Sequence, residues 1–600
     1  MRYILALFLL LTLNAKTQNF DWVWHAGGTT TSGYKEIVQV VTDKHGNSYS
    51  VGTCEDIMDL DPGPGVFLIA PPIGETVTFI LKLDSAKNFL WAKRMPFLYY
   101  TGLALDPEDN LLITGYHVGF SLDVDPHPVT TEYLPDPVSC GMSYIPVIFV
   151  LKFDNAGNFV WSKGMPGVPD PALACGNVTT YGIVSDPLGN MYISGGIIGG
   201  IDYDPGVDTV YSACLSGAWT FILKFDSNGN FVWVKEIKGP GSITTTRIRY
   251  NQFSNHLLLG GYFQYKLDFD PGPVLMLEGS TDFLNVNMFI LSLDTSGAFV
   301  DVKLFLDESN QWLTDLQADD NGNIYVACHG EDTVDVDPGP DTVLIAPVSP
   351  TDLLVFKLNA TRDYEWAVRV GPIHATWWSR PHIDVDVNSV AYVATMYNFP
   401  FDTDPGPATD LTTGFGTLAT CVLALDPFGG HNWMRSYDAR FKVLEVDAFR
   451  NIYIGGTFFD TLDFDPGIGV HTVPGVYSGA YLLKLNQPPM VTVPVDDFES
   501  ELENDSTAIS LPGEVLAFHE TENTNEKLRV YPNPTLGVVT IAVPSGTNAL
   551  TITDVYARVV KTITPVGISS TIDLSTFANG VYFITVLNNG VKQTVKVIKS

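Results

Sequence analysis

The stretch that decides the fold is residues 186–235, DPLGNMYISGGIIGGIDYDPGVDTVYSACLSGAWTFILKFDSNGNFVWVK. It holds a hairpin sequence, an apolar run, the acidic turn Asp202-Tyr203-Asp204-Pro205-Gly206, a second apolar run and the hairpin Asp226-Ser227-Asn228-Gly229-Asn230. A last strand containing Trp233 follows. Asp or Asn with Gly at a fixed offset is typical of tight hairpins, which need a residue with positive φ. Together with the apolar run before Asp186, the stretch predicts four short antiparallel strands.

The acidic turn recurs along the chain and defines a repeat. Seven copies begin 61 to 79 residues apart. The paired aspartates of the copies are Asp59 and Asp61, Asp123 and Asp125, Asp202 and Asp204, Asp268 and Asp270, Asp335 and Asp337, Asp402 and Asp404, and Asp463 and Asp465. A four-stranded sheet repeated in this way is the pattern of a β-propeller blade. We therefore predict an all-β fold with a seven-bladed propeller over residues 19–486, with an open solenoid as the alternative.

The two ends of the repeat region predict how the ring closes. The seventh repeat stops at Asn486 without its fourth strand, and residues 19–23 (NFDWV) match the fourth strand at 230–234 (NFVWV). We expect the N-terminal strand to complete the last blade, because an open solenoid has no use for a displaced strand. The repeats resemble those of bacterial extracellular propellers, a resemblance that implies the fold and says little about function.

The N-terminus predicts export. Arg2, an apolar run from Ile4 to Leu13 and the small residue Ala15 are typical of a secretory signal peptide, which we place at residues 1–18. The run is too short to span a bilayer and no other stretch is long enough, so we predict no integral membrane segment. The net charge of −34 argues against nucleic acid or anionic membrane surfaces as partners.

The six cysteines form no C-x-x-C pair, so a zinc or redox site is not predicted. Export permits disulfides, and a bridge could join two of Cys140, Cys175 and Cys214, which we place in loops of neighbouring repeats. Cys328 and Cys421 lie inside apolar strands, where we expect buried thiols.

The last part of the chain differs from the repeats. Residues 487–526 are acidic, contain neither Lys nor Arg, and are typical of a flexible linker. Residues 527–600 alternate apolar and polar residues between short turns, which predicts about seven strands in a small β-sandwich. The motifs of this segment are Tyr531-Pro532-Asn533-Pro534-Thr535, Gly537, Gly580 and Tyr582 of a later strand, and Lys596 in a Lys-rich terminal strand.

These motifs resemble the type A C-terminal sorting domain of the type IX (Por) secretion system of Bacteroidetes. The resemblance implies that the signal peptide takes the chain to the periplasm. It also implies that the type IX machinery is a partner of the C-terminal domain and carries the chain across the outer membrane. We then expect a protein that is secreted or attached to the outer cell surface.

The paired aspartates allow two interpretations. Carboxylates at i and i+2 project to one side of an extended chain, and Ca²⁺ favours oxygen ligands. The simpler interpretation is that Asp side chains cap the turn while Pro and Gly set its backbone. Since two carboxylates are too few for Ca²⁺, we favour turn capping and expect no cofactor, with calcium as the alternative.

Two sets of tryptophans could act as ligand platforms. One set recurs at a single blade position and predicts packing between blades; its members are Trp22, Trp91, Trp161, Trp233, Trp366 and Trp433. Trp377 and Trp378 instead break the repeat in a connection between blades, where exposed rings could stack on a sugar or a peptide.

No catalytic constellation emerges from the sequence. There is no H-E-x-x-H, no G-x-S-x-G and no Gly-rich phosphate loop, and every acidic pair that we singled out belongs to the repeat. We therefore predict a surface or secreted binding module for a glycan or a protein. The alternative is a propeller glycoside hydrolase or polysaccharide lyase, which a cluster of non-equivalent Asp, Glu, His or Arg side chains at one mouth of the channel would favour.

Overall fold

The computed structural model divides the chain into two compact units, Met1–Thr492 and Val493–Ser600. The structure describes residues 19–486 except 28–32, 141–142, 169–175, 274, 281–282, 308–309, 347–351, 373–379, 405–409, 413–417, 466–468 and 476–477, and in the second unit it describes 529–531, 538–542, 550–554, 559–563, 569–573, 580–588 and 591–599. The predicted signal peptide and linker lie outside the described residues.

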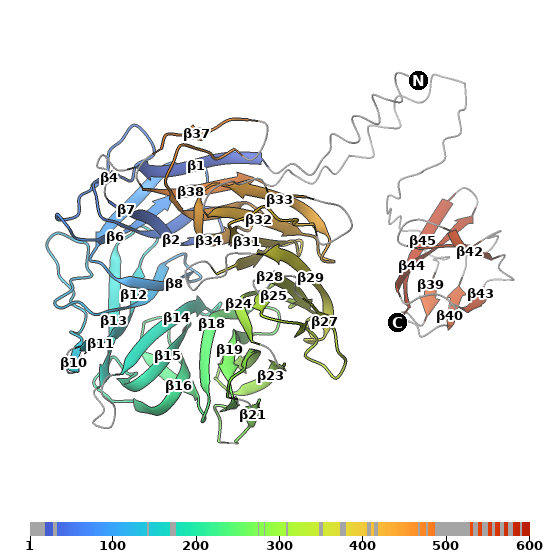
Figure 1. The fold of residues 1–600 in the computed structure, drawn as a ribbon, viewed down its shortest axis with the longest axis horizontal. Helices are drawn as coiled ribbons and strands as arrows, with labels where there is room; N and C mark the ends of the chain where they lie inside the picture. Colours follow the sequence, from blue (N-terminus) through green and yellow to red (C-terminus); the bar gives the residue numbers. More distant parts are fainter. Residues whose placement is uncertain are drawn as a thin grey trace. The chain divides into compact units, whose positions relative to one another are not determined.

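The described residues of the first unit form strands and no helix, which confirms the all-β prediction (Figure 1). Strands that are consecutive within each sheet pair in an antiparallel meander. In pairing order, the first four-stranded group is β2 (Lys35–Thr42), β3 (Ser48–Cys54), β6 (Val77–Leu83) and β7 (Phe89–Met95); the second is β8 (Tyr99–Leu105), β9 (Leu111–His117), β12 (Val147–Phe153) and β13 (Phe159–Val168); and the third is β14 (Asn177–Ser185), β15 (Met191–Asp202), β16 (Tyr211–Phe225) and β17 (Phe231–Ile237). The fourth group is β18 (Ser242–Asn251), β19 (His256–Gln264), β22 (Val286–Asp294) and β23 (Phe299–Phe305), and the fifth is β24 (Gln311–Ala318), β25 (Ile324–Gly330), β28 (Asp352–Leu358) and β29 (Tyr364–Pro372). The sixth group is β30 (His382–Val385), β31 (Ala391–Tyr397), β32 (Ala419–Leu425) and β33 (His431–Tyr437), and the seventh is β34 (Arg440–Val446), β35 (Ile452–Phe458), β38 (Gly479–Asn486) and β1 (Asn19–Gly27). Extra pairings join the second, third and fourth of these into one larger sheet. The architecture is that of a β-propeller.

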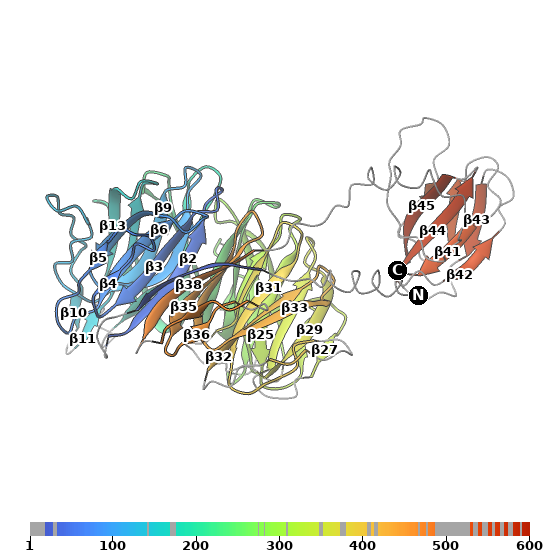
Figure 2. The same cartoon turned by 90° about the horizontal axis from the view of Figure 1, so that it is seen from above.

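Each sheet has two ends, and the chain direction decides what lies at each end (Figure 2). Because the strands alternate in direction, the second-to-third connection lies at the end where the first strand begins. That end carries the acidic turns, and we call it the mouth face. The tight hairpins lie at the opposite end, where Asp226 Oδ1 accepts the backbone N–H groups of Asn228 and Asn230 and Gly229 has φ of 80°.

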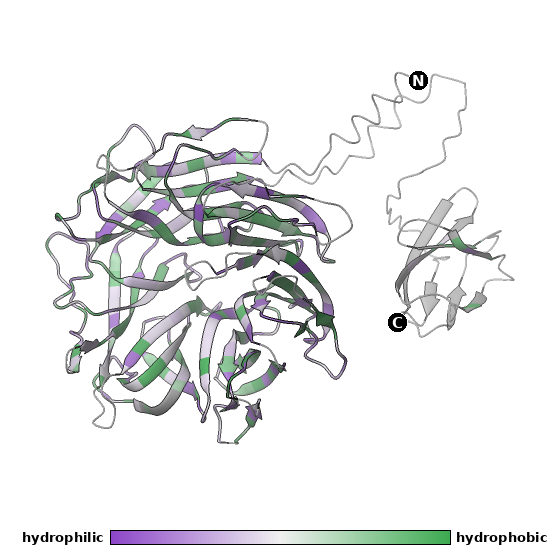
Figure 3. Ribbon diagram, viewed as in Figure 1, coloured by the Kyte–Doolittle hydropathy of each residue, from purple (hydrophilic) through white to green (hydrophobic). Residues whose placement is uncertain are grey.

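Hydrophobic residues follow the strands (Figure 3), and buried side chains of neighbouring sheets pack in shared clusters, as Ile37 does with Val443. β6 and β12 are buried along their whole length, whereas the outer strand β7 is only partly buried. The recurring tryptophan packs on the hairpin of the next sheet. Trp91 Nε1 donates a hydrogen bond to Asn155 O at 3.0 Å, and a Cβ at Gly157 would meet the Trp91 ring at 2.6 Å.

A recurring lysine of the third strand reaches the same hairpin. Its ammonium donates to a backbone carbonyl of the next sheet, as Lys152 Nζ does to Ser227 O at 3.3 Å and Lys224 Nζ to Thr295 O at 3.0 Å. Lysine and tryptophan therefore repeat one contact between successive sheets.

The N-terminal strand β1 is the fourth strand of the sheet that contains β38. It pairs with β38 from Asn19 opposite Asn486 to Gly27 opposite Gly479. Trp22 Nε1 and Lys484 Nζ both donate to Ser85 O, at 3.1 and 2.8 Å, in the hairpin between β6 and β7. The sheet that contains β1 and β38 therefore contacts the sheet of β2 through a tryptophan and a lysine, as successive sheets do elsewhere in the chain.

The described residues of the second unit form two sheets. One sheet is β39 (Arg529–Tyr531), β40 (Val538–Ala542) and β43 (Ser569–Asp573), and the other is β42 (Val559–Ile563), β41 (Leu550–Asp554), β44 (Gly580–Asn588) and β45 (Val591–Lys599). Among the residues described in either unit, no helix is both long and apolar enough to cross a membrane.

The cysteines fall into two groups. Cys140 is disulfide-bonded. Cys175 lies outside the described residues, and Cys214, which we expected in a loop, is a buried residue of β16. Cys328 and Cys421 are fully buried, and this burial raises the pKa of both thiols. They are inert core residues, as predicted.

Candidate functional site

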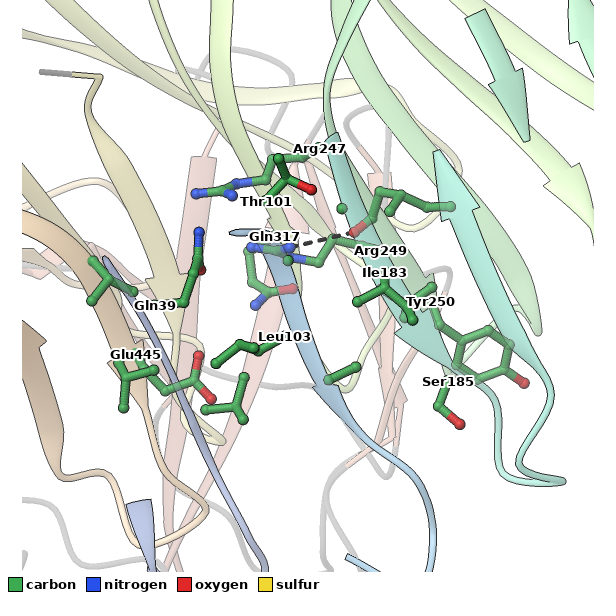
Figure 4. A pocket seen from close by; sticks show the side chains of 18 of the residues that line it. Gln39, Thr101, Leu103, Ile183, Ser185, Arg247, Arg249, Tyr250, Gln317 and Glu445 are labelled. Atoms are coloured by element: carbon green, nitrogen blue, oxygen red, sulfur yellow. Dashed lines mark hydrogen bonds between the residues drawn. The ribbon is translucent and has the colours of Figure 1, made fainter. Parts of the chain in front are cut away.

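The first strands of the sheets line a cavity of about 310 Å³ along the central channel. Its walls come from β2, β8, β14, β18, β24, β30 and β34. Figure 4 shows Gln39, Arg249, Gln317 and Glu445 with their polar groups in this space, while Leu103 and Ile183 supply apolar wall.

Equivalent positions of the first strands can be matched through the pairing register. In β2, β8, β14, β18, β24 and β34 the register with the second strand shifts at a bulge near the mouth face. We call the positions directly after the bulge the first tier, and those two residues later the second tier; β30 has no bulge among its described residues, and His382 is matched to the first tier by its register with β31. The first tier is Gln39, Gly102, Gly182, Arg247, Asp315, His382 and Val443, and the second is Val41, Ala104, Val184, Arg249, Gln317, Asp384 and Glu445. The charged residues therefore gather on β18, β24, β30 and β34, opposite small or apolar residues of β8 and β14.

Asp315 ties three neighbouring sheets together in the first tier. Arg247 Nε lies 2.7 Å from Asp315 Oδ1, and the backbone N–H of Ile383 donates to Asp315 Oδ2 at 3.2 Å. The carboxylate is 1% exposed. Although burial by itself raises the pKa of Asp315, Arg247 and Arg249 hold that pKa below its usual value. Asp315 is therefore an ionised, fully engaged link.

Asp384 makes the corresponding link in the second tier. Gln317 Nε2 donates to Asp384 Oδ1 at 2.7 Å, and the backbone N–H of Val446 donates to Asp384 Oδ2 at 2.7 Å. Glu445 continues the series toward β2, since the backbone N–H of Thr42 donates to Glu445 Oε1 at 3.3 Å. These carboxylates thus connect β24, β30, β34 and β2 in turn.

Glu445 is a carboxyl group of the cavity whose pKa lies well above its usual value. Burial, followed by the negative charge of Asp384, raises the pKa of Glu445 to about 8. Burial also raises the pKa of Asp384. Near pH 7 the two carboxylates therefore hold a proton that an exposed pair would release.

His382 is neutral in this setting. Its ring lies beside Arg247, with Nδ1 at 3.0 Å from Arg247 Nη2. Burial, reinforced by the positive charge of Arg247, lowers the pKa of His382 to about 3. The imidazole therefore acts in the channel as an uncharged hydrogen-bonding group.

Two aromatic pairs stand at the mouth end of the channel strands. Tyr99 and Tyr116 are cross-strand partners whose rings stack at 4.8 Å, and Tyr99 is 43% exposed. Trp312 and His329 occupy the same register positions of another sheet and stack at 5.1 Å. The mouth face therefore offers accessible rings directly above the polar tiers.

The paired aspartates lie in the turns of the mouth face and accept backbone hydrogen bonds. Asp202 Oδ1 accepts the N–H groups of Asp204 and Val210, and Asp204 Oδ1 accepts the N–H of Gly206. The first aspartate bonds in the same way in the other six copies, at Asp59, Asp123, Asp268, Asp335, Asp402 and Asp463. Among the described residues no three His, Cys, Asp or Glu side chains converge as a metal site. The calcium alternative stays a prediction.

Other predicted site residues are described in part or not at all. Trp377 and Trp378 lie outside the described residues, as do Pro532, Asn533, Pro534, Thr535 and Gly537. Tyr531 is in β39, Gly580 and Tyr582 are in β44, and Lys596 is in β45. The Tyr582 side chain is 7% exposed.

Sequence reasoning missed the channel cluster. The paired aspartates drew attention because they repeat, whereas Arg247, Asp315, Asp384 and Glu445 do not. The sequence signal that could have found them is a lack of repetition: polar residues stand at first-strand positions where other repeats have small or apolar residues.

Residues 529–600 match the family described as "Secretion system C-terminal sorting domain". The chain carries a type IX sorting domain. Proteins with this domain are exported by the type IX system of Bacteroidetes, so this protein is secreted or placed at the cell surface. The predicted resemblance and location are confirmed.

Similarity elsewhere in the chain is low. An uncharacterized WD repeat-containing protein of Acanthamoeba polyphaga mimivirus is 25% identical over 182 residues, which are 29% of this chain and 12% of that protein. The chain thus spans about an eighth of that relative. Two solved structures are the Dos1 propeller (9% identity, TM-score 0.30, 64% of this chain and 92% of that one) and the NanB sialidase of Streptococcus pneumoniae (8%, 0.34, 80% and 96%). With TM-scores below 0.5, neither carries an inference about activity.

Proposed function

We propose that the first unit is a seven-bladed propeller closed by β1 and that it binds a polar ligand, a glycan or a peptide, at the channel mouth outside the cell. Closure is supported by the contacts of Trp22 and Lys484 with Ser85, which match the contacts between successive sheets elsewhere. Closure leaves no open seam, so the channel is a rigid frame for the groups that line it.

One observation supports the binding function. The residues that form the turns recur from repeat to repeat, whereas the residues that line the channel differ between repeats. Turn aspartates recur in all seven copies, and the third-strand lysine recurs in five of the seven sheets, with Ser292 and Ala424 in the other two. The first tier holds Gly102 and Gly182 at one side of the channel and Arg247 and Asp315 at the other, in equivalent positions. Structure alone does not require this difference, since small residues fit the same positions in other blades. A binding site needs such asymmetry to orient a ligand.

Binding is favoured over catalysis because the carboxylates of the channel are engaged. Asp315 and Asp384 each accept backbone and side-chain hydrogen bonds from neighbouring strands. A nucleophile or general base needs a lone pair that is free to meet the substrate. These two groups hold the channel together and present the remaining polar side chains.

The test is a screen of the full-length protein against an array of glycans and peptides. Tyr99→Ala, which removes an accessible ring of the mouth, should weaken binding at least about tenfold. Phe428→Ala removes a ring that is 82% exposed in the hairpin between β32 and β33, at the opposite face, and should leave binding unchanged. Equal loss in both variants, or no loss in either, would contradict binding at the mouth.

Glycoside hydrolysis is a second candidate because of Glu445. Its pKa of about 8 keeps the carboxyl protonated near neutral pH, as a general acid requires. The discriminating measurement is release of reducing ends from each glycan that binds. Turnover that Glu445→Gln abolishes would establish the enzyme, and binding without turnover would exclude it for that glycan.

A further inference from the structure

An aromatic ring and an arginine lie close to the mouth ends of the neighbouring strands β24 and β30. The Ile383 N–H to Asp315 Oδ2 bond of 3.2 Å aligns these neighbouring strands. Trp312 lies near the start of β24, and Arg380 lies two residues before β30. Trp312 stacks on His329, and Arg380 acts on the same histidine as a nearby positive charge, so His329 links the ring and the arginine at the entrance.

Trp312 provides an apolar platform at this entrance. Its ring stacks on the His329 ring with centroids 5.1 Å apart and planes 19° from parallel, so His329 covers one face of the Trp312 ring. The side chain remains partly exposed. The C–H face of a pyranose ring packs well on such a flat, supported aromatic surface, because it covers apolar area while the sugar hydroxyls stay in water.

Arg380 provides an unneutralised positive charge. Among the described residues it has no acidic partner, whereas Arg247 and Arg249 share Asp315 and Lys442 lies 3.6 Å from Glu36. Arg94, Arg435 and Arg440 also have no acidic partner among the described residues, but they lie on β7, on β33 and at the first residue of β34 and do not line the cavity, whereas the charge of Arg380 acts on His382 of the channel. A guanidinium presents paired N–H donors that match a planar carboxylate or a sulfate.

The surroundings keep this charge concentrated in one group. Burial, followed by the positive charge of Arg380, lowers the pKa of His329 to about 4. His382 is also neutral, as described above. The histidines beside Arg380 therefore neither compete for an anion nor add charge, and a ligand meets one cation beside one aromatic face.

We infer that this mouth binds a sugar that carries an anionic group, with Trp312 packing on the ring and Arg380 pairing with the anion. The inference rests on the proposed function, since it names the ligand class of the same channel mouth. The carboxylate of a uronic acid and a sulfate ester share the required chemistry, and the experiment separates them.

The experiment measures binding of the full-length protein to three sets of oligosaccharides of matched length: uronate-containing, sulfated and neutral. We expect the anionic sugars to bind at least about tenfold more tightly than the neutral ones, with affinity that falls as salt rises. Whether the uronate or the sulfated set binds identifies the anion. Arg380→Gln should abolish this preference, and Arg380→Lys should restore part of it.

Matched controls keep the result specific. Arg94→Gln removes the same charge from an exposed site on the outer strand β7 and should change affinity less than twofold. Trp312→Ala should weaken binding of every sugar, whereas Phe428→Ala at the opposite face should not.

Several outcomes would overturn the inference. One is equal binding of neutral and anionic sugars, another is no binding of any anionic sugar, and a third is wild-type affinity in Arg380→Gln. If Trp312→Ala or Tyr99→Ala loses a ligand that Arg380→Gln retains, the anion assignment is wrong and binding at the mouth stands. If none of these variants alters binding of a ligand, the proposed function fails as well.

Discussion

Aspartates serve two different purposes in this propeller, one in the acidic turns and the other in the channel. Asp202 accepts N–H groups from its own turn, whereas Asp315 accepts hydrogen bonds from Arg247 and Ile383 of two other sheets. The first carboxylate is partly exposed and the second is buried. Local capping repeats because every blade needs it. Linking of sheets by channel carboxylates is confined to the side formed by β18, β24, β30, β34 and β2, and Asp315 and Asp384 are buried, so the loss of either should be more costly than the loss of a turn aspartate.

The largest effect should come from removing contacts between whole sheets. Deleting residues 19–25 from the mature chain removes most of β1, including the buried Trp22 and Trp24, and exposes the edge of β38. Loss of a single buried Trp typically costs about 3–5 kcal/mol, and a free edge promotes aggregation. Calorimetry and light scattering should show a markedly lower Tm or aggregation. An equally short deletion at 500–506, in the linker segment, should leave the Tm of the propeller as it was, and an unchanged Tm in the first deletion would rule out closure by β1.

The next effect isolates one cross-sheet carboxylate. Asp315→Ala leaves Arg247 largely buried without its partner and should destabilise the protein by about 3–5 kcal/mol. Asp301→Ala is the matched control, because Asp301 also pairs with an arginine, Arg362 at 2.8 Å, but is 36% exposed on an outer strand. That loss should cost about 0–1 kcal/mol. Similar losses of Tm in the two variants would mean that the channel links are no stronger than surface pairs.

The channel also differs from the turns in its response to pH. The pKa of Glu445 is about 8 in the folded protein and near 4.3 when unfolded, so folding favours the protonated form. Its contribution to stability is complete below the unfolded pKa and is lost as pH rises through about 8. Glu445→Gln keeps a neutral side chain at every pH.

Melting temperatures of the two proteins measured from pH 4 to pH 9 test this expectation. The variant should match the wild type near pH 4, below the unfolded pKa, and melt a few degrees higher at pH 9. Glu75→Gln, in the exposed connection before β6, should leave the pH profile unchanged. Parallel profiles for wild type and Glu445→Gln would mean that Glu445 titrates normally.

Sequence predicted what local chemistry determines. The hairpins follow from Asp, Asn and Gly within five residues, and the N-terminal strand was found because Asn19 to Val23 matches the fourth strand of other repeats. The channel cluster depends on register between distant segments, since Arg247 and Asp315 are 68 residues apart. The sequence around Arg247 or around Asp315 contains no motif that predicts this pairing. The protonation of Glu445 likewise depends on Asp384, which belongs to another sheet.

The smallest effect should come from one acidic turn. Asp202→Asn keeps an oxygen that can accept the turn N–H groups and loses only the charge, so the cost should be at most about 1 kcal/mol. EDTA should leave the Tm unchanged if the turns only cap themselves, which is the result we expect. If the turns instead hold Ca²⁺ with added backbone carbonyl oxygens, a hundredfold excess of Ca²⁺ over its Kd would stabilise the protein by about 2.7 kcal/mol. Calorimetry with EDTA and with millimolar Ca²⁺ separates the two cases: a Ca²⁺-dependent rise in Tm that Asp202→Asn reduces would replace capping with metal binding, because capping requires no ion.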